Sequence, residues 1–175
     1  DRELLAGYAR DTWRSIEAVA GAGCLPADQL RKTKDGWVAE GLTSPTNIAG
    51  YLWSTLAAER LKLISHEESG RRINAVLATL ARLERSSGFF YNWYEPASGA
   101  RALAWPSGGT IRPFLSSVDN GWLAAALILV GNIRPELKPQ TDAILEPMDF
   151  AFFYDPYDPA DPVAHPGLLY GGYWT

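Results

Sequence analysis

A chain of 175 residues is long enough for one compact domain and too short for two ordinary ones, so we expect residues 1–175 to form a single domain. Hydrophobic residues make up 47% of the chain and charged residues 21%, which excludes intrinsic disorder as a description of the whole. The formal net charge of -4 argues against a nucleic-acid partner, and the longest apolar run, Trp122–Val130, is too short to span a bilayer.

The first half of the chain predicts three helices. Residues 1–20 carry apolar side chains at helical spacing, and Gly21–Gly23 is expected to end this helix. Residues 24–43 show no sustained period and are expected to form a long loop. The second helix starts at Thr43–Thr46, where a hydroxyl cap precedes a proline, and it is apolar on nearly all sides. Ser65 caps a third, more charged helix that is expected to run to about Arg85.

The second half begins with an aromatic, alternating pattern. Two short extended runs flank Pro96–Gly99, so we expect a short β-hairpin over residues 89–105. Ser116–Asp119 predicts another helix start, and the helix to about Val130 is again apolar all round. Pro135 opens a further amphipathic stretch to about Leu145, and residues 146–175 are expected to form a loop.

Residues 44–52 and 116–123 resemble each other. Each segment places a hydroxyl cap before an Asn or Asp, small residues, an aromatic residue and a leucine, and each is followed by an outer helix. Alternating inner and outer helices are typical of helical solenoids and α/α toroids. We therefore expect a mainly α fold made of helical hairpins of an (α/α)6 toroid. Two and a half hairpins cannot close a ring of six, so the chain is expected to hold its N-terminal part, a fragment or a processed chain.

The aromatic content of 12% and its placement on loops beside Asn, Asp and Glu suit the binding of sugar rings. The first turns of the two inner helices are expected on one rim, with the hairpin over it. Glycoside hydrolysis needs two carboxyl groups about 5 to 10 Å apart, and we assign Glu95 as the acid and Asp119 as the base or substrate-orienting group. Burial beside Trp93 and Tyr94 would raise the pKa of Glu95, as an acid needs. The residues expected to contact the sugar are Asn47, Trp53, Asn92, Trp93, Tyr94, Asn120 and Trp122.

Plainer interpretations of the same residues stay open. Asp119 is also typical of a helix cap, Glu95 of a surface turn, and Asn47 of a residue that satisfies backbone groups at a buried helix start. The aromatic residues would then close the ends of a helical domain.

No metal or organic cofactor is expected. Cys24 is the single cysteine, and with His66 and His165 as the only histidines there is no cluster at zinc spacing. The acidic tail that includes Asp149 and Asp155 offers oxygen ligands that suit calcium, but its spacing fits no EF-hand. His165 has no Ser or Cys partner for a triad, and the glycine-rich segment 107–110 lacks the lysine of a phosphate loop.

Four segments together resemble the signature blocks of a known family. They are Thr43–Ile48, Thr79–Arg85, Tyr91–Tyr94 and Ser116–Gly121. They are similar to blocks of glucoamylase-like proteins, which are related to bacterial endo-β-1,2-glucanases and to the glucan-handling domain of cyclic β-1,2-glucan synthases. The resemblance implies an (α/α)6 toroid, an oligo- or polysaccharide substrate in a rim cleft, acid/base catalysis without an organic cofactor, and a secreted or periplasmic bacterial protein. It places Asp119 on the Val-Asp block and Glu95 on a position that is often Asp in the synthase relatives.

The leading hypothesis is a glycoside hydrolase-like domain. The first alternative is a non-catalytic carbohydrate-binding or cell-wall-associated module that uses the same aromatic rim. A second alternative, an α/α toroid that acts on an isoprenoid, would need a largely apolar cavity or an Asp-rich metal motif. The linkage that is cut, the stereochemical outcome and the number of subunits stay open.

Overall fold

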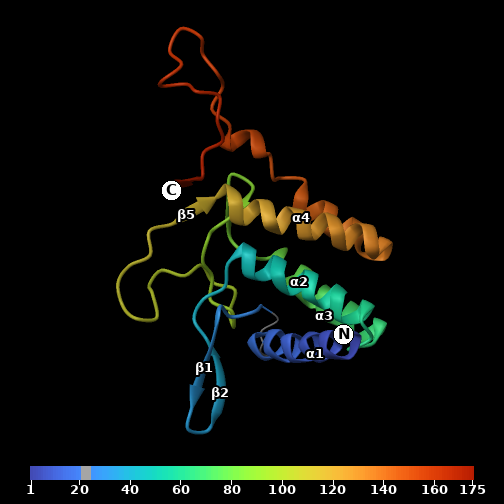
Figure 1. The fold of residues 1–175 in the computed structure, drawn as a ribbon. Coiled ribbons are helices and arrows are strands. Elements are labelled where there is room, and N and C mark those ends of the chain that lie inside the picture. The colour runs from blue at the N-terminus through green and yellow to red at the C-terminus, as the bar shows by residue number, and fades with distance from the viewer. Residues whose placement is uncertain (21–24) are drawn as a thin grey trace.

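The computed structural model describes residues 1–20 and 25–175 (Figure 1). Gly21–Gly23, expected to end the first helix, and Cys24 lie outside the described residues. The fold is mainly helical, as predicted. Its helices are α1 (Arg2–Val19), α2 (Pro45–Arg60), α3 (His66–Leu80), α4 (Ser117–Ile133) and α5 (Lys138–Leu145), with short 3-10 turns at Pro135–Leu137 and Phe150–Phe153. Small antiparallel strand pairs join them: β1 (Gln29–Thr33) with β2 (Gly36–Glu40), β3 (Arg85–Ser86) with β4 (Phe89–Phe90), and β5 (Phe114–Ser116) with β6 (Gly172–Trp174).

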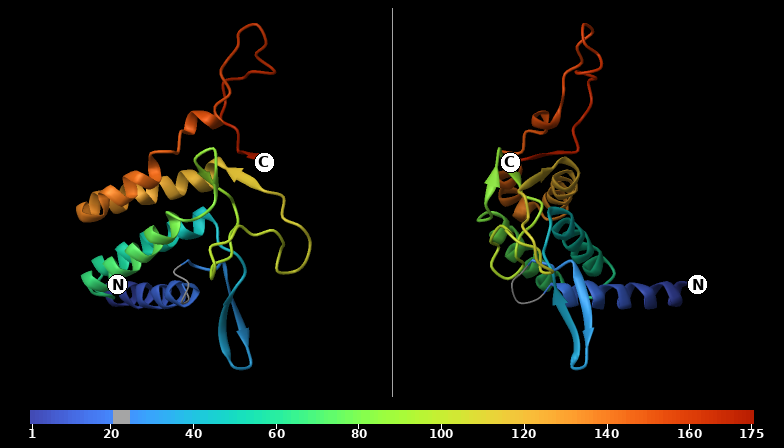
Figure 2. Two further views of the ribbon diagram at one scale, coloured as in Figure 1. Left: turned by 180° about the vertical axis from the view of Figure 1, so that it is seen from behind. Right: turned by 90° about the vertical axis from the view of Figure 1, so that its left-hand side faces the viewer.

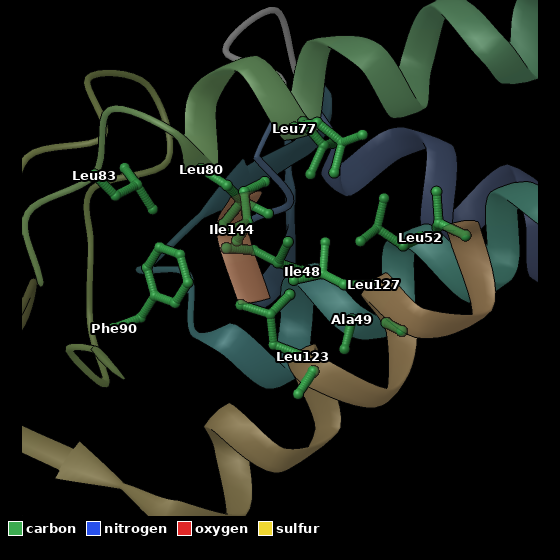
Figure 3. Close-up of a cluster of buried hydrophobic side chains, with 14 of the residues drawn as sticks. Ile48, Ala49, Leu52, Leu77, Leu80, Leu83, Phe90, Leu123, Leu127 and Ile144 are labelled. Atoms are coloured by element: carbon green, nitrogen blue, oxygen red, sulfur yellow. The ribbon is translucent and has the colours of Figure 1, made fainter. Parts of the chain in front are cut away.

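The core forms where α2 and α4 pack side by side and α3 and α5 cover their outer side (Figures 1 and 2). Figure 3 shows Ile48 and Leu52 of α2 close to Leu123 and Leu127 of α4. These four leucine and isoleucine side chains are at most 1% exposed. Burial of such a side chain contributes about 1.5 to 3 kcal/mol, so this contact holds the first turns of α2 and α4 in a fixed relation.

The charged third helix is the outer one. Its apolar stripe, which includes Ile73, Val76, Leu77 and Leu80, is buried, and its opposite side carries charges. The helix ends at Leu80 rather than near Arg85, because Arg85–Ser86 turns back to pair with Phe89–Phe90. Gly88 makes this turn possible: its φ is +83°, and a Cβ there would lie 1.8 Å from the carbonyl oxygen of Pro147.

Two expected loops contain strands. Residues 24–43 include the hairpin β1–β2, in which Leu30 pairs with Ala39 and Gly36 has a φ of +129°. Most side chains of this hairpin are exposed, so the sequence has no alternating apolar pattern to reveal it. The tail also pairs: β6 joins β5, and Phe153 is fully buried against Phe89.

The hairpin expected over residues 89–105 is present in a reduced form. Tyr94 forms single bridges to Arg101 and to Thr43, and the Glu95 amide donates to the Ala100 carbonyl at 2.8 Å. The prediction of a turn at residues 96–99 is therefore confirmed. Phe89 and Phe90, expected to belong to this hairpin, pair instead with Arg85–Ser86.

Two apolar faces are more exposed than expected. The helix α4 was expected to be enclosed on all sides, yet five of its apolar side chains are 39% to 61% exposed: Val118, Trp122, Ile128, Leu129 and Ile133. On α1, only Trp13 is buried, whereas Leu4, Leu5 and Tyr8 are more than half exposed. Among the helices of the described residues, none combines the length and the apolar character that crossing a membrane requires.

Candidate functional site

The first turns of α2 and α4 are built in the same way. Ser116 caps α4: its hydroxyl accepts from the Asp119 amide (3.1 Å) and donates to Asp119 Oδ2 (2.5 Å). Ser44 caps α2 with the same pair of bonds to the Asn47 amide (3.2 Å) and to Asn47 Oδ1 (2.9 Å). The similarity between residues 44–52 and 116–123 is thus a repeated capping arrangement, which satisfies backbone N–H groups at each helix start.

Asp119 joins three elements of the fold. The Thr46 hydroxyl of α2 donates to Asp119 Oδ1 at 2.7 Å. Asn92, with its amide nitrogen turned toward Asp119, donates to Oδ2 at 3.1 Å, and its amide oxygen accepts from Trp93 Nε1 at 3.3 Å. With the Ser116 hydroxyl, three side chains therefore donate to one half-buried carboxylate. An ionised carboxylate accepts about four hydrogen bonds, so these donors fix its orientation and leave little spare capacity.

Two tryptophans lie farther along the same pair of helices. Trp53 of α2 and Trp122 of α4 meet edge to face with ring centroids 5.3 Å apart. Trp122 is 50% exposed and follows Asp119 by three residues, so both belong to one side of α4. Asp119, Asn92 and Trp93 therefore lie together at the start of α4, and the Trp53–Trp122 pair lies farther along α2 and α4.

Tyr94 and Asn120 lie in the interior and offer no surface to a sugar. Both are fully buried. The Tyr94 hydroxyl donates to the Glu84 carbonyl (2.6 Å) and accepts from the Tyr91 amide (2.8 Å), and burial raises the pKa of its phenol. Asn120 donates to the Phe90 and Ser116 carbonyls and accepts from the Phe90 amide. Both side chains hold the aromatic segment, residues 89–95, in place.

Glu95 and Asn47 also differ from their expected surroundings. The Glu95 side chain is exposed, and of the two aromatic residues expected beside it Tyr94 points into the core while Trp93 is half-buried. Neighbouring residues of an extended segment point to opposite sides, which explains why the Glu95 side chain is exposed while that of Tyr94 is buried. Asn47 shares a hollow of about 430 Å³ with residues of α1 and with Asp28, rather than with Asp119.

Sequence reasoning missed Thr46 and Ser116 as members of the site. Both were seen only as part of helix-start signals, yet both donate to Asp119. The repeated cap is the signal that could have identified them, since two packed helices with matching first turns bring those turns together. Within residues 1–20 and 25–175, no group of three or more His, Cys, Asp and Glu side chains is placed to hold a metal ion.

Comparison with known proteins defines the class of this protein. Residues 8–151 match the family described as "Protein of unknown function (DUF3131)", and the chain belongs to that family. A curated relative, the cyclic β-(1,2)-glucan synthase NdvB of Rhizobium meliloti, is 38% identical over 137 residues. The match covers 77% of this chain and 4% of that much longer protein.

Solved structures share the fold at low sequence identity. A glucoamylase-like protein of Bacteroides fragilis has a TM-score of 0.70 at 16% identity, covering 91% of this chain and 41% of its own. The endo-β-1,2-glucanase of Chitinophaga pinensis has a TM-score of 0.60 at 14% identity, covering 89% and 41%. The β-1,2-glucanase of Parabacteroides distasonis has a TM-score of 0.63 at 15% identity, covering 87% and 22%. The chain thus spans less than half the length of each, and the predicted resemblance to the glucoamylase-like group is confirmed.

Proposed function

We propose that this chain is the glucan-binding part of a glycoside hydrolase-like domain, with Asp119 as the residue that orients the sugar. The observation that carries the proposal is the convergence of Thr46, Ser116 and Asn92 on the Asp119 carboxylate. The exposed Trp122 ring lies one helical turn away. A fixed hydrogen-bonding carboxylate beside an aromatic ring suits a sugar, which presents hydroxyl groups at its rim and C–H groups on its faces.

A β-1,2-linked glucan is the proposed substrate. The 38% identical relative is named as a cyclic β-1,2-glucan synthase, and two of the proteins that share the fold are named as β-1,2-glucanases. Hydrolysis requires a second carboxyl group besides Asp119. Within this chain we assign that role to Glu95, which lies on the same segment as Asn92 and is open to solvent. Glu95 would protonate the leaving oxygen while Asp119 holds the sugar or the attacking water.

The helices are proposed to form part of an (α/α)6 toroid, of which residues 1–175 are the N-terminal part. Two features support this arrangement. The pair α2 and α4 lies inside while α3 and α5 lie outside. In addition, α4 leaves an apolar side uncovered within the described residues, as expected where the next inner helix of a ring would pack.

A non-catalytic sugar-binding module is the second candidate. Asp119 already accepts hydrogen bonds from three side chains, and the Glu95 side chain is exposed to solvent. This geometry suits binding at least as well as proton transfer, which requires a carboxyl group free to exchange a proton with the substrate.

Enzyme and module are distinguished by an assay of reducing ends. The protein is incubated with linear β-1,2-, β-1,3- and β-1,4-glucans, and the assay is repeated with Glu95→Gln and Asp119→Asn. For a hydrolase, each substitution lowers turnover by about 100-fold or more, because general acid/base catalysis contributes at least that much. Asp142→Asn on the outer helix α5 is the matched control and keeps full activity. Binding without turnover in the unsubstituted protein supports the module, and absence of both overturns the proposal.

A further inference from the structure

A second hollow lies beside Trp105 and the β1–β2 hairpin. It has a volume of about 430 Å³, within the range of about 300 to 1,000 Å³ typical of ligand pockets. Its walls come from the β1–β2 hairpin and from the turn that follows the aromatic segment. The residues that line it are Asp28, Gln29, Glu40, Gly41, Leu42, Trp105, Pro106 and Ser107.

Trp105 supplies the apolar wall of this hollow. Its ring is 41% exposed and meets Trp93 edge to face, with centroids 5.4 Å apart. Two backbone hydrogen bonds hold Trp105 in its turn, one from its amide to the Gly109 carbonyl and one from the Gly108 amide to its carbonyl. An exposed aromatic ring on a fixed turn keeps its apolar face available to a ligand without the entropic cost of ordering it.

The opposite wall is polar and equally well fixed. Glu40 accepts from Arg31 Nε at 2.7 Å, and the Asp28 amide donates to the Leu42 carbonyl at 2.9 Å. Gly41 allows the Asp28 carboxylate to come close, since a Cβ at position 41 would lie 1.9 Å from Asp28 Oδ1. Burial raises the pKa of Asp28, and hydrogen bonds from its own amide and that of Leu42 act against this increase. Carboxylates held in this way are acceptors for the hydroxyl groups of a sugar.

Direct contacts connect this hollow to the Asp119 site. Asn92 bridges Asp119 and the Trp93 indole, and Trp93 packs on Trp105. Trp93 also packs on a small buried cluster of Leu42, Ala102 and Ile111, which fixes the position of its indole ring.

We propose that the hollow lined by Trp105 is a second saccharide-binding position, which takes a more distant glucose unit of the glucan chain held at Asp119. The inference rests on the proposed function and adds to it that the substrate is a chain of several units rather than a short saccharide. Trp105 stacks on one face of the glucose ring, and Asp28, Gln29 and Glu40 receive or donate hydrogen bonds at its hydroxyl groups.

The test measures affinity for linear β-1,2-gluco-oligosaccharides of graded length by calorimetry. Trp105→Ala weakens binding of the long oligosaccharides about tenfold, which is the loss expected for one aromatic contact, and leaves the short ones unchanged. Trp105→Phe keeps a flat ring and retains most of the affinity. Ser107→Trp fills the hollow and produces the same selective loss while Trp105 stays in place. Trp37→Ala is the matched control, because Trp37 is 65% exposed on β2 and lies outside the hollow.

The outcomes separate this inference from the proposed function. If the unsubstituted protein binds no glucan of any length, both are wrong. If it binds glucans and Trp105→Ala leaves the dependence on length as it was, or weakens short and long oligosaccharides equally, the second position is wrong and the Asp119 site stands.

Discussion

Asn120 supplies hydrogen bonds that the short strand β4 cannot obtain from a neighbouring strand. Its amide oxygen accepts from the Phe90 amide at 3.0 Å, and its nitrogen donates to the carbonyls of Phe90 and Ser116 at 2.9 Å each. The side chain is fully buried, so no water can replace these bonds. The first turn of α4 and the aromatic segment are therefore held together by one residue next to Asp119.

We expect Asn120→Asp to destabilise the protein by about 3 kcal/mol, because the new side chain cannot donate to two buried carbonyls that then lack a partner. Urea denaturation monitored by circular dichroism measures the loss. Asn132→Asp is the control: Asn132 lies exposed on the same helix, and its replacement should change the stability by no more than about 0.5 kcal/mol. Equal effects of the two substitutions would contradict the role given to Asn120.

The sequence contains a signal that Asn120 is buried, although its residue type alone does not indicate this. When the two caps are superposed at Ser44 and Ser116, Asn47 matches Asp119 and Ile48 matches Asn120. Ile48 is a core residue, so the position of Asn120 points inward. Residue type alone predicts that Asn120 contacts the sugar. Its position relative to the cap predicts instead that Asn120 is buried, and in the structure it is buried.

At the scale of elements, the buried charge of Arg134 joins the C-terminal ends of α2 and α4. Arg134, at the end of α4, is 3% exposed on its side chain and donates to Glu59 of α2 and to the His66 carbonyl at the start of α3. His66 Nδ1 lies 2.8 Å from Glu59 Oε1. Burial acts to raise the pKa of Glu59, but hydrogen bonds from Ser69, His66 and Arg134, together with the Arg134 charge, outweigh it, so the pKa lies below its ordinary value.

This network predicts a pH dependence of stability. A carboxyl group whose pKa is lowered by folding stabilises the protein above its unfolded pKa, and this stabilisation is lost as the pH falls through the folded pKa. At pH 7 we expect Glu59→Gln to cost about 3 kcal/mol, because it leaves the Arg134 charge buried without its main partner. The difference from the unsubstituted protein should shrink when both are measured by thermal denaturation well below pH 4.5.

Glu136→Gln provides the control for this network. Glu136 lies 3.4 Å from the same guanidinium, but its side chain is 58% exposed. An exposed ion pair contributes about 0 to 1 kcal/mol, so this variant should be nearly as stable as the original at every pH. A Glu59→Gln variant with the same small, pH-independent effect would rule out the network as a source of stability.

Secondary structure was predictable wherever a local pattern exists. The caps at Ser44, Ser65 and Ser116 each accept from the backbone amide three residues later, as the hydroxyl signals indicate. The hairpin β1–β2 and the strand β6 were missed for a common reason. Their pairing depends on backbone hydrogen bonds rather than on a buried side, so no periodicity marks them in the sequence.

For the whole molecule, the return of the tail to the start of α4 is the feature that no local pattern predicts. Residues 154–170 extend away from the helices, and β6 brings the chain back to β5 (Figure 1). The Ser117 amide donates to the Gly171 carbonyl at 3.1 Å, and its hydroxyl donates to the Tyr170 carbonyl at 2.7 Å. The tail is thus anchored directly beside the cap that positions Asp119.

We expect removal of Gly172–Thr175 to release the tail and leave the helical core folded, because the contacts among α2, α3, α4 and α5 do not involve β6. Hydrogen exchange should show loss of protection at β5 and at the paired amides of Asp155 and Tyr170, with the amides of α2 and α4 unchanged. Removal of Thr175 alone is the control, since it retains all three β5–β6 residue pairs. Loss of protection throughout α4 after the longer truncation would mean that β6 supports the core itself, and the glucan binding proposed at Asp119 would then depend on the tail as well as on the helices.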